Sequence, residues 1–328
     1  MTSPSVATTP VFSLTDKRVW VAGHRGMAGS AIVRRLERER CEILTARRDD
    51  ADLRRQSEVE DWMAQAKPDV VFLAAATVGG IHANNTRPAD FLYDNLAIET
   101  NIIHAAYRLK VAKLVFLGSS CIYPRLAAQP MTEDSLLTGP LEPTNEWYAV
   151  AKIAGIKLCQ AYRRQHGCDF ISAMPTNLFG YGDNFDLQQG HVAAALLAKI
   201  HKAKIEGAPT VELWGSGSPK REFLFVDDLA DGLVFLAQHY SGEPHVNLGT
   251  GVEVSIRELA ELIAEVAGYA GTFNYDTSKP DGSPRKLMDV SRMAAMGWSA
   301  PTTLREGFAR TYGWYADNVG AGTLRGIG

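Results

Sequence analysis

Near its amino terminus the chain places a strand, three evenly spaced glycines and a helix in direct succession. The apolar run over residues 18–22 predicts a buried strand. Gly23, Gly26 and Gly29 follow it, and residues 30–36 predict a helix. Glycines at such a turn permit a tight bend and a close backbone approach to a pyrophosphate, which the helix N-terminus attracts. This arrangement predicts a dinucleotide-binding α/β fold.

Later apolar segments continue the strand–helix rhythm. Residues 69–76, 114–117 and 170–174 predict buried strands, and residues 90–108 and 148–164 predict helices between them. We therefore expect an α/β protein with a Rossmann-type doubly wound parallel sheet and a smaller C-terminal α/β substrate lobe. The expected parts are a flexible leader (1–16), a Rossmann domain (17–180, rejoined by about 220–255), a mainly substrate-binding lobe (181–319) and a flexible tail (320–328).

Shorter segments carry local expectations. Residues 78–85 predict a polar loop, residues 191–200 a helix, and Leu229 the start of another helix. Ser255 followed by Glu258 forms a capping box, which is typical of a helix N-terminus.

Charge and cysteine content narrow the class of protein. A net charge of −3 over 328 residues argues against a nucleic-acid or anionic-membrane partner. No apolar run approaches the ~20 residues that cross a bilayer, and residues 1–16 lack the features of a signal peptide. Because Cys41, Cys121, Cys159 and Cys168 show no metal-ligand spacing, we expect free thiols, no metal site and a cytoplasmic location.

A proton-transfer group is predicted downstream of the strand at 114–117. That strand breaks into a loop with Ser119, and the next helix begins with Tyr148 and Lys152, one turn apart on one face. A free tyrosine, with a pKa of about 10, is a poor acid or base at neutral pH, and an adjacent ammonium lowers that pKa. Ser119 can donate to a carbonyl oxygen that gains charge as hydride arrives. A Tyr-x-x-x-Lys pair also occurs on ordinary helices, but its order after the glycine turn and the serine favours catalysis.

The strand over residues 41–45 ends in cations, where NAD enzymes usually carry an acidic residue. Arg47 and Arg48 suit a 2′-phosphate, with Arg25 of the glycine turn as a third contact. Any one of these arginines could equally be a solvated surface residue, but as a set they favour NADP(H).

Several segments together resemble the GDP-L-fucose synthases of the extended short-chain dehydrogenase/reductase superfamily. These are residues 23–32, 78–85, 118–124, 142–159, 174–178 and 278–286, and the similarity runs from about residue 17 to about residue 318. The resemblance implies a bifunctional, NADPH-dependent enzyme that converts GDP-4-keto-6-deoxy-D-mannose to GDP-L-fucose by 3,5-epimerisation and 4-reduction. It also implies a homodimer that pairs the helices predicted at 90–108 and 148–164.

By this resemblance, Cys121 is the base and His191 the acid that invert the carbons beside the ketone. Ser119 and Tyr148 hold the ketone oxygen, and Lys152 tunes Tyr148 and binds the nicotinamide ribose. Cysteine suits the role of base only when its pKa is lowered from about 8.5.

The resemblance also implies binding residues for cofactor and substrate. The cofactor residues are Gly23, His24, Arg25, Gly26, Met27, Ala28, Gly29, Arg47, Arg48, Asp52, Leu53, Leu117, Gly118, Ser119, Ser120, Lys152, Pro175, Thr176, Asn177, Leu178 and His191. The substrate residues are Lys199, Trp214, Arg221 and Asp281. Trp214 suits packing on guanine or ribose, with burial in the core as the alternative, whereas Arg221 suits a diphosphate and Asp281 the sugar or base edge. The family often has arginine where this chain has Lys199, which keeps the charge but loses bidentate geometry.

Two alternative functions stay open from the sequence. One is a related nucleotide-sugar enzyme, such as a colitose-type synthase or a UDP-hexose 4-epimerase, although a 4-epimerase needs no Cys–His pair. The other is a non-catalytic NADP-binding regulatory module. Such modules typically lose the tyrosine or the lysine, and this chain keeps both.

Overall fold

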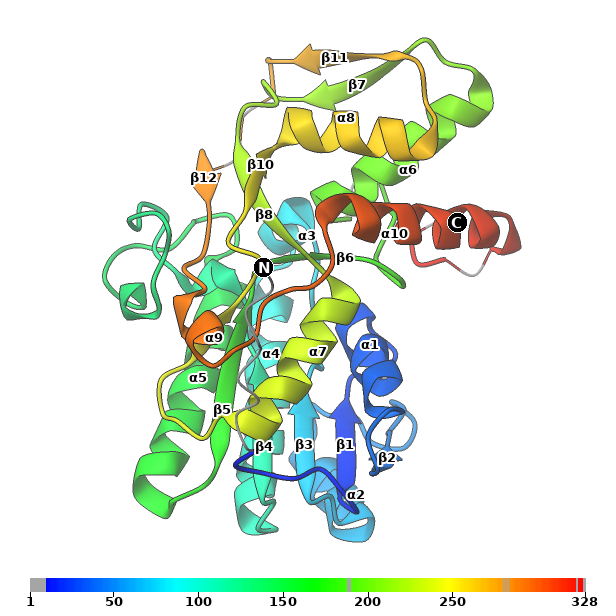
Figure 1. The fold of residues 1–328 in the computed structure, drawn as a ribbon. Coiled ribbons are helices and arrows are strands. Elements are labelled where there is room, and N and C mark those ends of the chain that lie inside the picture. Colours follow the sequence, from blue (N-terminus) through cyan, green and yellow to red (C-terminus); the bar gives the residue numbers. More distant parts are fainter. Residues whose placement is uncertain (1–9, 188–189, 280, 282, 323, 327–328) are drawn as a thin grey trace, which may run out of the picture.

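The computed structural model describes residues 10–187, 190–279, 281, 283–322 and 324–326. Within these residues, six parallel strands form the central sheet in the order β2-β1-β3-β4-β5-β9 (Figure 1). They are β1 (Arg18–Ala22), β2 (Glu42–Leu44), β3 (Val70–Leu73), β4 (Lys113–Leu117), β5 (Phe170–Pro175) and β9 (Val246–Leu248). Because β1 lies between β2 and β3, the winding reverses beside β1, and a crevice opens at the carboxyl ends of these strands.

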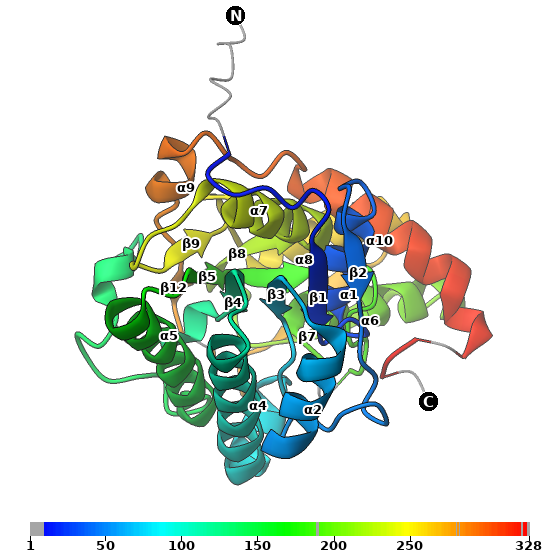
Figure 2. The ribbon, with the colours of Figure 1, turned by 90° about the horizontal axis from the view of Figure 1, so that it is seen from below.

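Helices cover both faces of this sheet, as the view from below shows (Figure 2). α1 (Met27–Leu36) and α7 (Val226–His239) cover one face, while α2 (Gln56–Ala66), α4 (Pro88–Arg108) and α5 (Glu146–His166) cover the other. Strand residues alternate between two cores, so that Val19 and Val21 pack under α1 and α7, and Trp20 packs on the opposite side. The expected doubly wound parallel sheet is confirmed.

A second lobe stands over the carboxyl edge of the sheet (Figure 1). Its sheet joins β6 (Asn177–Phe179), β8 (Lys220–Phe225), β10 (Glu253–Ser255) and β12 (Arg285–Lys286), and a separate pair joins β7 (Thr210–Trp214) to β11 (Thr272–Asp276). α6 (Val192–Glu206), α8 (Ile256–Ala267) and α10 (Leu304–Asn318) pack in the same lobe around a third core. The short helices are α3 (Ile81–Thr86), α9 (Ser291–Ala295), η1 (Ser120–Ile122), η2 (Glu133–Ser135) and η3 (Val319–Ala321).

Several local expectations are confirmed and others are corrected. The capping box at Ser255 is present, with the Glu258 N–H donating to the Ser255 Oγ at 3.1 Å. Residues 78–85, expected as a loop, include the start of α3. α7 begins at Val226 rather than Leu229, because two aspartates can occupy its first turn. Among the described residues, α7, β9 and α9 pack on the first lobe, whereas β8 and β10 pair in the second lobe.

The described parts of both terminal segments pack on the rest of the molecule. In the assigned leader, the Val11 and Phe12 amides donate to the Gln238 carbonyl at 2.8 and 3.0 Å, and Leu14 is buried in the core. In the assigned tail, Leu324 is buried and the Phe185 N–H donates to the Arg325 carbonyl at 3.0 Å. One apolar side chain and backbone hydrogen bonding thus fix each segment, while residues 1–9, 323, 327 and 328 lie outside the described part.

No helix among the described residues is long and apolar enough to cross a membrane.

Candidate active site

A cavity of about 1480 Å³ lies between the carboxyl edge of the central sheet and the second lobe. Every residue that the sequence analysis assigned to cofactor, substrate or catalysis lines this cavity. The cavity therefore brings together side chains that lie up to 258 positions apart in the chain, from Gly23 to Asp281. Among the described residues, no group of three or more His, Cys, Asp and Glu side chains could hold a metal ion.

The glycine turn after β1 has the shape that a dinucleotide needs. Gly23 has a φ of +88°, and a Cβ there would lie 2.7 Å from the backbone of Ala75. A Cβ on Gly29 would lie 2.1 Å from the Gly23 carbonyl oxygen, so the turn and α1 approach closely only without side chains. Gly26 precedes α1 with no side-chain cap, which leaves the first amides of the helix free for a phosphate. These residues fit the pyrophosphate of a dinucleotide.

Cations gather where the adenosine end of that dinucleotide would lie. The side chains of Arg47 and Arg48 are 67% and 71% exposed and approach Asp50 and Asp52 only at 3.6 and 3.7 Å. Their exposure leaves them free to bind a phosphate. Arg54, which was not predicted as a site residue, lines the same cavity and donates to both carboxylate oxygens of Asp52 at 3.0 and 2.8 Å.

The pairing with Arg54 changes what Asp52 can offer. The guanidinium lowers the pKa of the Asp52 carboxyl to about 2 and fixes its position. Asp52 therefore stays charged at neutral pH, and its neighbour Leu53 lies on the cavity wall with its carbonyl held by the Asn101 side chain at 3.1 Å.

The loop after β4 carries a serine and a thiol. Ser119 caps η1 by accepting the Cys121 N–H at 3.4 Å, and this short helix turns both side chains to the cavity. Gly118 packs against Met174 so tightly that a Cβ would lie 2.3 Å from its sulfur. The turn thus holds Ser119 and Cys121 close to the end of the sheet.

Tyr148 and Lys152 lie on the first turns of α5, as predicted, but Lys152 has a partner that the sequence analysis missed. The Lys152 ammonium lies 2.8 Å from the Glu99 carboxylate on α4, and both residues are 1% exposed. The ammonium also lies 5.7 Å from the centre of the Tyr148 ring. A Cβ on Gly155 would contact Glu99 at 2.8 Å, so the helices approach closely at this pair.

The pKa values of the Tyr148 phenol and the Cys121 thiol are both raised. Burial is the main cause for Tyr148, followed by Cys121 and Glu99, and it raises the phenol pKa well above 10. The expectation of a lowered phenol pKa is therefore wrong for this structure, because burial disfavours the phenolate and the negative charges of Cys121 and Glu99 add to that effect. Burial also raises the pKa of Cys121, against the opposing effects of Lys286, a hydrogen bond with Ser119, and Lys152.

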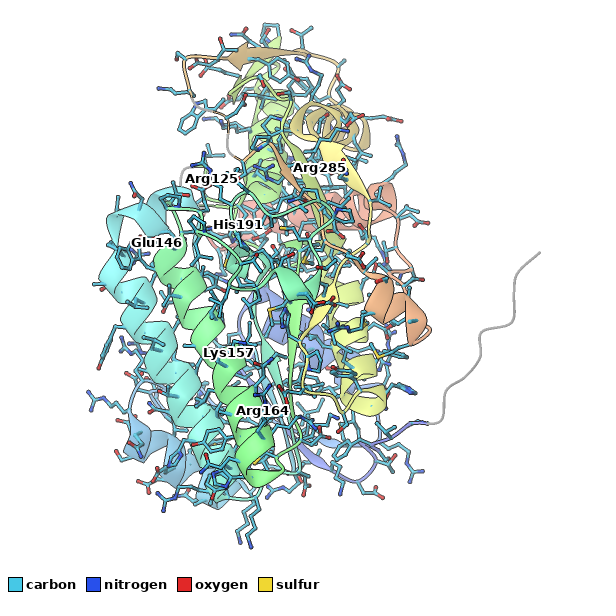
Figure 3. All side chains as sticks on the ribbon, turned by 90° about the vertical axis from the view of Figure 1, so that its left-hand side faces the viewer. Arg125, Glu146, Lys157, Arg164, His191 and Arg285 are labelled. Atoms are coloured by element: carbon cyan, nitrogen blue, oxygen red, sulfur yellow. The ribbon has the colours of Figure 1, made fainter. Side chains whose placement is uncertain are left out.

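His191 enters the cavity from the second lobe. It precedes α6 in an extended conformation and lies between the lobes, above the amino-terminal end of α5 (Figure 3). Partial enclosure of the imidazole by the cavity walls lowers its pKa below 6.5, although the residue as a whole is exposed. The expected helix over 191–200 is present, but it begins one residue later and continues to Glu206.

The segment that follows β5 forms the floor of the cavity. Its position is fixed through the Glu222 carbonyl, which accepts from Thr176 Oγ1 at 3.3 Å and from Asn177 Nδ2 at 2.7 Å. Four other residues predicted to bind the cofactor also line the cavity, namely Leu117, Ser120, Pro175 and Leu178.

The second lobe supplies an exposed aromatic ring and cations. Trp214 is 62% exposed, so the alternative of core packing is wrong, and the ammonium groups of Lys199 and Lys279 lie 5.5 and 5.7 Å from its ring centre. Arg221 donates to the Lys220 carbonyl at 2.7 Å, and burial lowers its pKa.

The Asp281 carboxylate is already engaged in the second lobe. It accepts the backbone N–H and the Oγ of Ser216 at 2.9 and 2.7 Å. Asp281 thus holds the loop that follows Trp214 against the wall of the cavity.

Three comparisons with known proteins agree with this geometry. Residues 19–249 match the model of the NAD dependent epimerase/dehydratase family. The chain is 56% identical to a GDP-L-fucose synthase of Sinorhizobium fredii, over 94% of this chain and 99% of that protein. It is 58% identical to GDP-L-fucose synthase 1 of Arabidopsis thaliana, over 94% of this chain and 97% of that protein.

A solved structure agrees as well. A GDP-L-fucose synthetase from Naegleria fowleri, described as bound to NADP, superposes with a TM-score of 0.88 at 28% identity, covering 97% of this chain and 99% of that one. The chain therefore belongs to the NAD dependent epimerase/dehydratase family and, within it, to the GDP-L-fucose synthases.

Proposed function

We propose that this chain uses NADPH to convert GDP-4-keto-6-deoxy-D-mannose to GDP-L-fucose, by inverting C3 and C5 and then reducing the C4 ketone. The observation that carries the proposal is the meeting of two kinds of group in one cavity. Ser119, Tyr148 and Lys152 form the set that a ketone reductase needs. The Cys121 thiol and the His191 imidazole add a base and an acid from different lobes, which a simple reductase does not need.

The epimerisation follows from the acidity of protons beside a ketone. The Cys121 thiolate takes the proton from C3, and the charge moves to the ketone oxygen, where Ser119 and Tyr148 donate hydrogen bonds. The His191 imidazolium then returns a proton to the other face of C3. The thiol has gained one proton and the imidazole has lost one, so exchange with water restores both before the same steps invert C5.

The reduction uses the first-lobe residues alone. NADPH, when bound, supplies a hydride to C4. The Tyr148 phenol gives its proton to the ketone oxygen, and its raised pKa keeps the phenol protonated at neutral pH until then. Lys152, anchored by Glu99, binds the nicotinamide ribose.

Binding divides between the lobes. The glycine turn (23–29) holds the pyrophosphate of NADP(H), Arg25, Arg47 and Arg48 hold its 2′-phosphate, and the segment 175–178 flanks the nicotinamide. For the substrate, Trp214 packs against guanine or ribose, while Arg221 and Lys199 pair with the diphosphate. Asp281 contributes indirectly, because it fixes the loop beside Trp214.

We also propose that the chain forms a homodimer through α4 and α5, which form an outer face of the molecule (Figure 3). Large apolar side chains are exposed on these helices, with Tyr93 at 68%, Trp147 at 41% and Val150 at 43%. Sedimentation equilibrium should give twice the chain mass, and Val150→Glu should shift it towards the monomer. The monomer mass for the unchanged protein would contradict the dimer.

A cytoplasmic location completes the proposal, and it is supported by the four free cysteines, which persist best in a reducing compartment. Fractionation of cells should recover the protein with soluble cytoplasmic markers.

The function is tested by NADPH oxidation, followed by absorbance, with GDP-4-keto-6-deoxy-D-mannose as substrate. NMR of the product should identify GDP-L-fucose. A 6-deoxy sugar reduced at C4 but not inverted at C3 and C5 would leave a plain 4-reductase and remove the roles of Cys121 and His191.

A further inference from the structure

Lys286 is one of several cations in the cavity that have no role in the proposed reaction. Lys286 lies on β12, which pairs in parallel with β8 so that Lys286 stands beside Arg221. It lines the cavity, and no ion pair joins its ammonium to a carboxylate within the described ranges. Its neighbour Arg285 is different, because Glu253 on β10 holds the Arg285 side chain at 2.7 Å. Both side chains line the cavity, and among the described residues only that of Arg285 pairs with a carboxylate.

The backbone after β12 is bound to the loop that continues from Cys121. The Met131 N–H donates to the Leu287 carbonyl at 2.8 Å, and the Asp289 N–H donates to the Met131 carbonyl at 2.9 Å. The Leu287 N–H also donates to the Gln129 side chain at 2.8 Å. From the other side, the buried Glu222 carboxylate accepts the Met288 N–H at 3.0 Å. These bonds hold the end of β12 beside residues 129–131, and Cys121 and Lys286 line the same cavity.

The charges around Cys121 leave Lys286 as its main cationic neighbour. Lys286 has the largest effect that favours the thiolate, ahead of the Ser119 hydrogen bond and Lys152. Lys152 on α5 is neutralised by Glu99, and Tyr148 on the same helix carries no charge at neutral pH. Burial lowers the pKa of Lys286, whereas Cys121 raises it, Arg221 on β8 lowers it and the Glu142 carboxylate raises it.

We propose that Lys286 is the counter-ion of the Cys121 thiolate, a positioning cation from the second lobe that lets the thiol serve as base in the epimerisation. This inference rests on the proposed function for its catalytic meaning, but the pairing itself concerns the free enzyme. A thiol enclosed by protein ionises poorly, and a nearby ammonium is the usual remedy. The first lobe thus holds the base, and the second lobe holds the charge that activates it.

The pairing predicts a specific pH profile for epimerisation. The pKa of His191 is lowered and that of Cys121 is raised, so the thiolate–imidazolium form is a constant minor fraction between the two values. Below the His191 pKa the rate falls as thiolate is lost, and above the Cys121 pKa it falls as imidazolium is lost. A change that raises the pKa of Cys121 therefore moves the alkaline limb to higher pH and lowers the plateau.

The direct test is alkylation of Cys121 by iodoacetamide in the free protein, followed across pH by mass spectrometry of the peptide that contains this residue. Lys286→Gln should raise the pH midpoint of alkylation by about one pH unit or more. Lys286→Arg should restore a midpoint near that of the unchanged protein, because it keeps the charge. Arg285→Gln, the matched control on the same strand, should leave the midpoint unchanged.

Deuterium exchange at C3 and C5 in D₂O, without NADPH, supplies the second readout. Lys286→Gln should move the alkaline limb upwards and lower the plateau rate, roughly tenfold if the alkylation midpoint rises by one pH unit. An unchanged alkylation midpoint with only a raised KM for the GDP-sugar would overturn the proposal and make Lys286 a substrate ligand. Circular dichroism checks folding, and Lys286→Met removes the same charge where the glutamine variant does not fold.

The two readouts separate the inference from the proposed function. If the unchanged protein exchanges no deuterium, the epimerase function fails, while a higher alkylation midpoint in Lys286→Gln still supports the Lys286–Cys121 pair. If the unchanged protein exchanges deuterium and the midpoint does not move in Lys286→Gln, the function stands and the pair is contradicted.

Discussion

On the first-lobe side of the cavity, Tyr148 and Lys152 come from one long helix and are fixed by a buried ion pair, whereas on the second-lobe side His191, Trp214 and Arg221 come from three separate elements. Lys152 and Glu99 are each 1% exposed, while Trp214 is 62% exposed. The lysine of the reductive group is thus buried and paired, whereas the aromatic ring proposed to meet the nucleotide sugar is exposed. Under the proposed mechanism, this difference means that one lobe supplies the proton chemistry at C4, whereas inversion at C3 and C5 needs groups from both lobes.

The largest effect is expected when the Tyr148 phenol is removed, because this change should slow reduction while epimerisation continues. Tyr148→Phe should slow NADPH oxidation by about 10²–10⁴-fold, because the ketone oxygen loses its proton donor. Deuterium exchange at C3 and C5 should continue, since Cys121 and His191 remain, although the oxyanion loses one hydrogen bond. Equal loss of exchange and reduction would remove the division between the lobes, and near-normal NADPH oxidation would remove the role of Tyr148.

A second prediction concerns the part of the cavity where the adenosine end of NADP(H) binds in the proposal. Replacing Arg47 and Arg48 with alanine should lower the preference for NADPH over NADH by about 10–100-fold, since charge-assisted hydrogen bonds contribute ~1.5–3 kcal/mol. The measurement is the ratio of kcat/KM for the two cofactors. Arg38→Ala removes an exposed arginine outside the cavity and should leave the ratio unchanged. Equal losses for NADPH and NADH would show that these arginines do not recognise the phosphate.

The smallest effect is expected for a change in the ion pair between Lys152 and Glu99. Glu99 raises the pKa of Tyr148, so Glu99→Gln should lower that pKa and move the alkaline limb of the reduction rate to lower pH, by about one pH unit or less. Above this limb the phenol has lost the proton that it must donate. The buried Lys152 also loses its partner, so the midpoint of thermal unfolding should fall.

Asp90→Asn on the same helix is the control for Glu99, because Asp90 is exposed. It should leave the limb unchanged and lower the midpoint of unfolding much less, because only the small contribution of an exposed carboxylate in the first turn of the helix is lost. If Glu99→Gln lowers the midpoint of thermal unfolding but leaves the alkaline limb of the reduction rate unchanged, Glu99 has a structural role alone.

The sequence predicted the parts of the site that lie in local motifs. The glycine turn, Ser119 and the Tyr148–Lys152 pair each sit beside a strong strand or helix signal, and all lie where expected. Glu99 was not predicted because its ion pair with Lys152 forms only when α4 packs on α5. The helical spacing could have indicated it, because Glu99 shares the buried side of the predicted helix with Asn95 and Ile102. A carboxylate on that side requires a buried partner.

Lys286 was missed for a related reason. It ends a motif that the sequence analysis used only for resemblance, and the strand β12 has two residues, too short for a period to show. Its position depends on hydrogen bonds to residues 129–131, more than 150 positions earlier in the chain. Burial of the terminal segments was not predicted either, because a single leucine at position 14 or 324 does not form a hydrophobic pattern.

The central claim is that a thiol and an imidazole from different lobes perform the inversion while the first lobe performs the reduction. The most direct test follows Cys121→Ser with GDP-4-keto-6-deoxy-D-mannose in D₂O, measuring deuterium at C3 and C5 and NADPH binding in parallel. The account predicts that deuterium incorporation falls by about 10²-fold or more, while NADPH binds as tightly as before. Incorporation at the rate of the unchanged protein, or loss of NADPH binding together with incorporation, would contradict it.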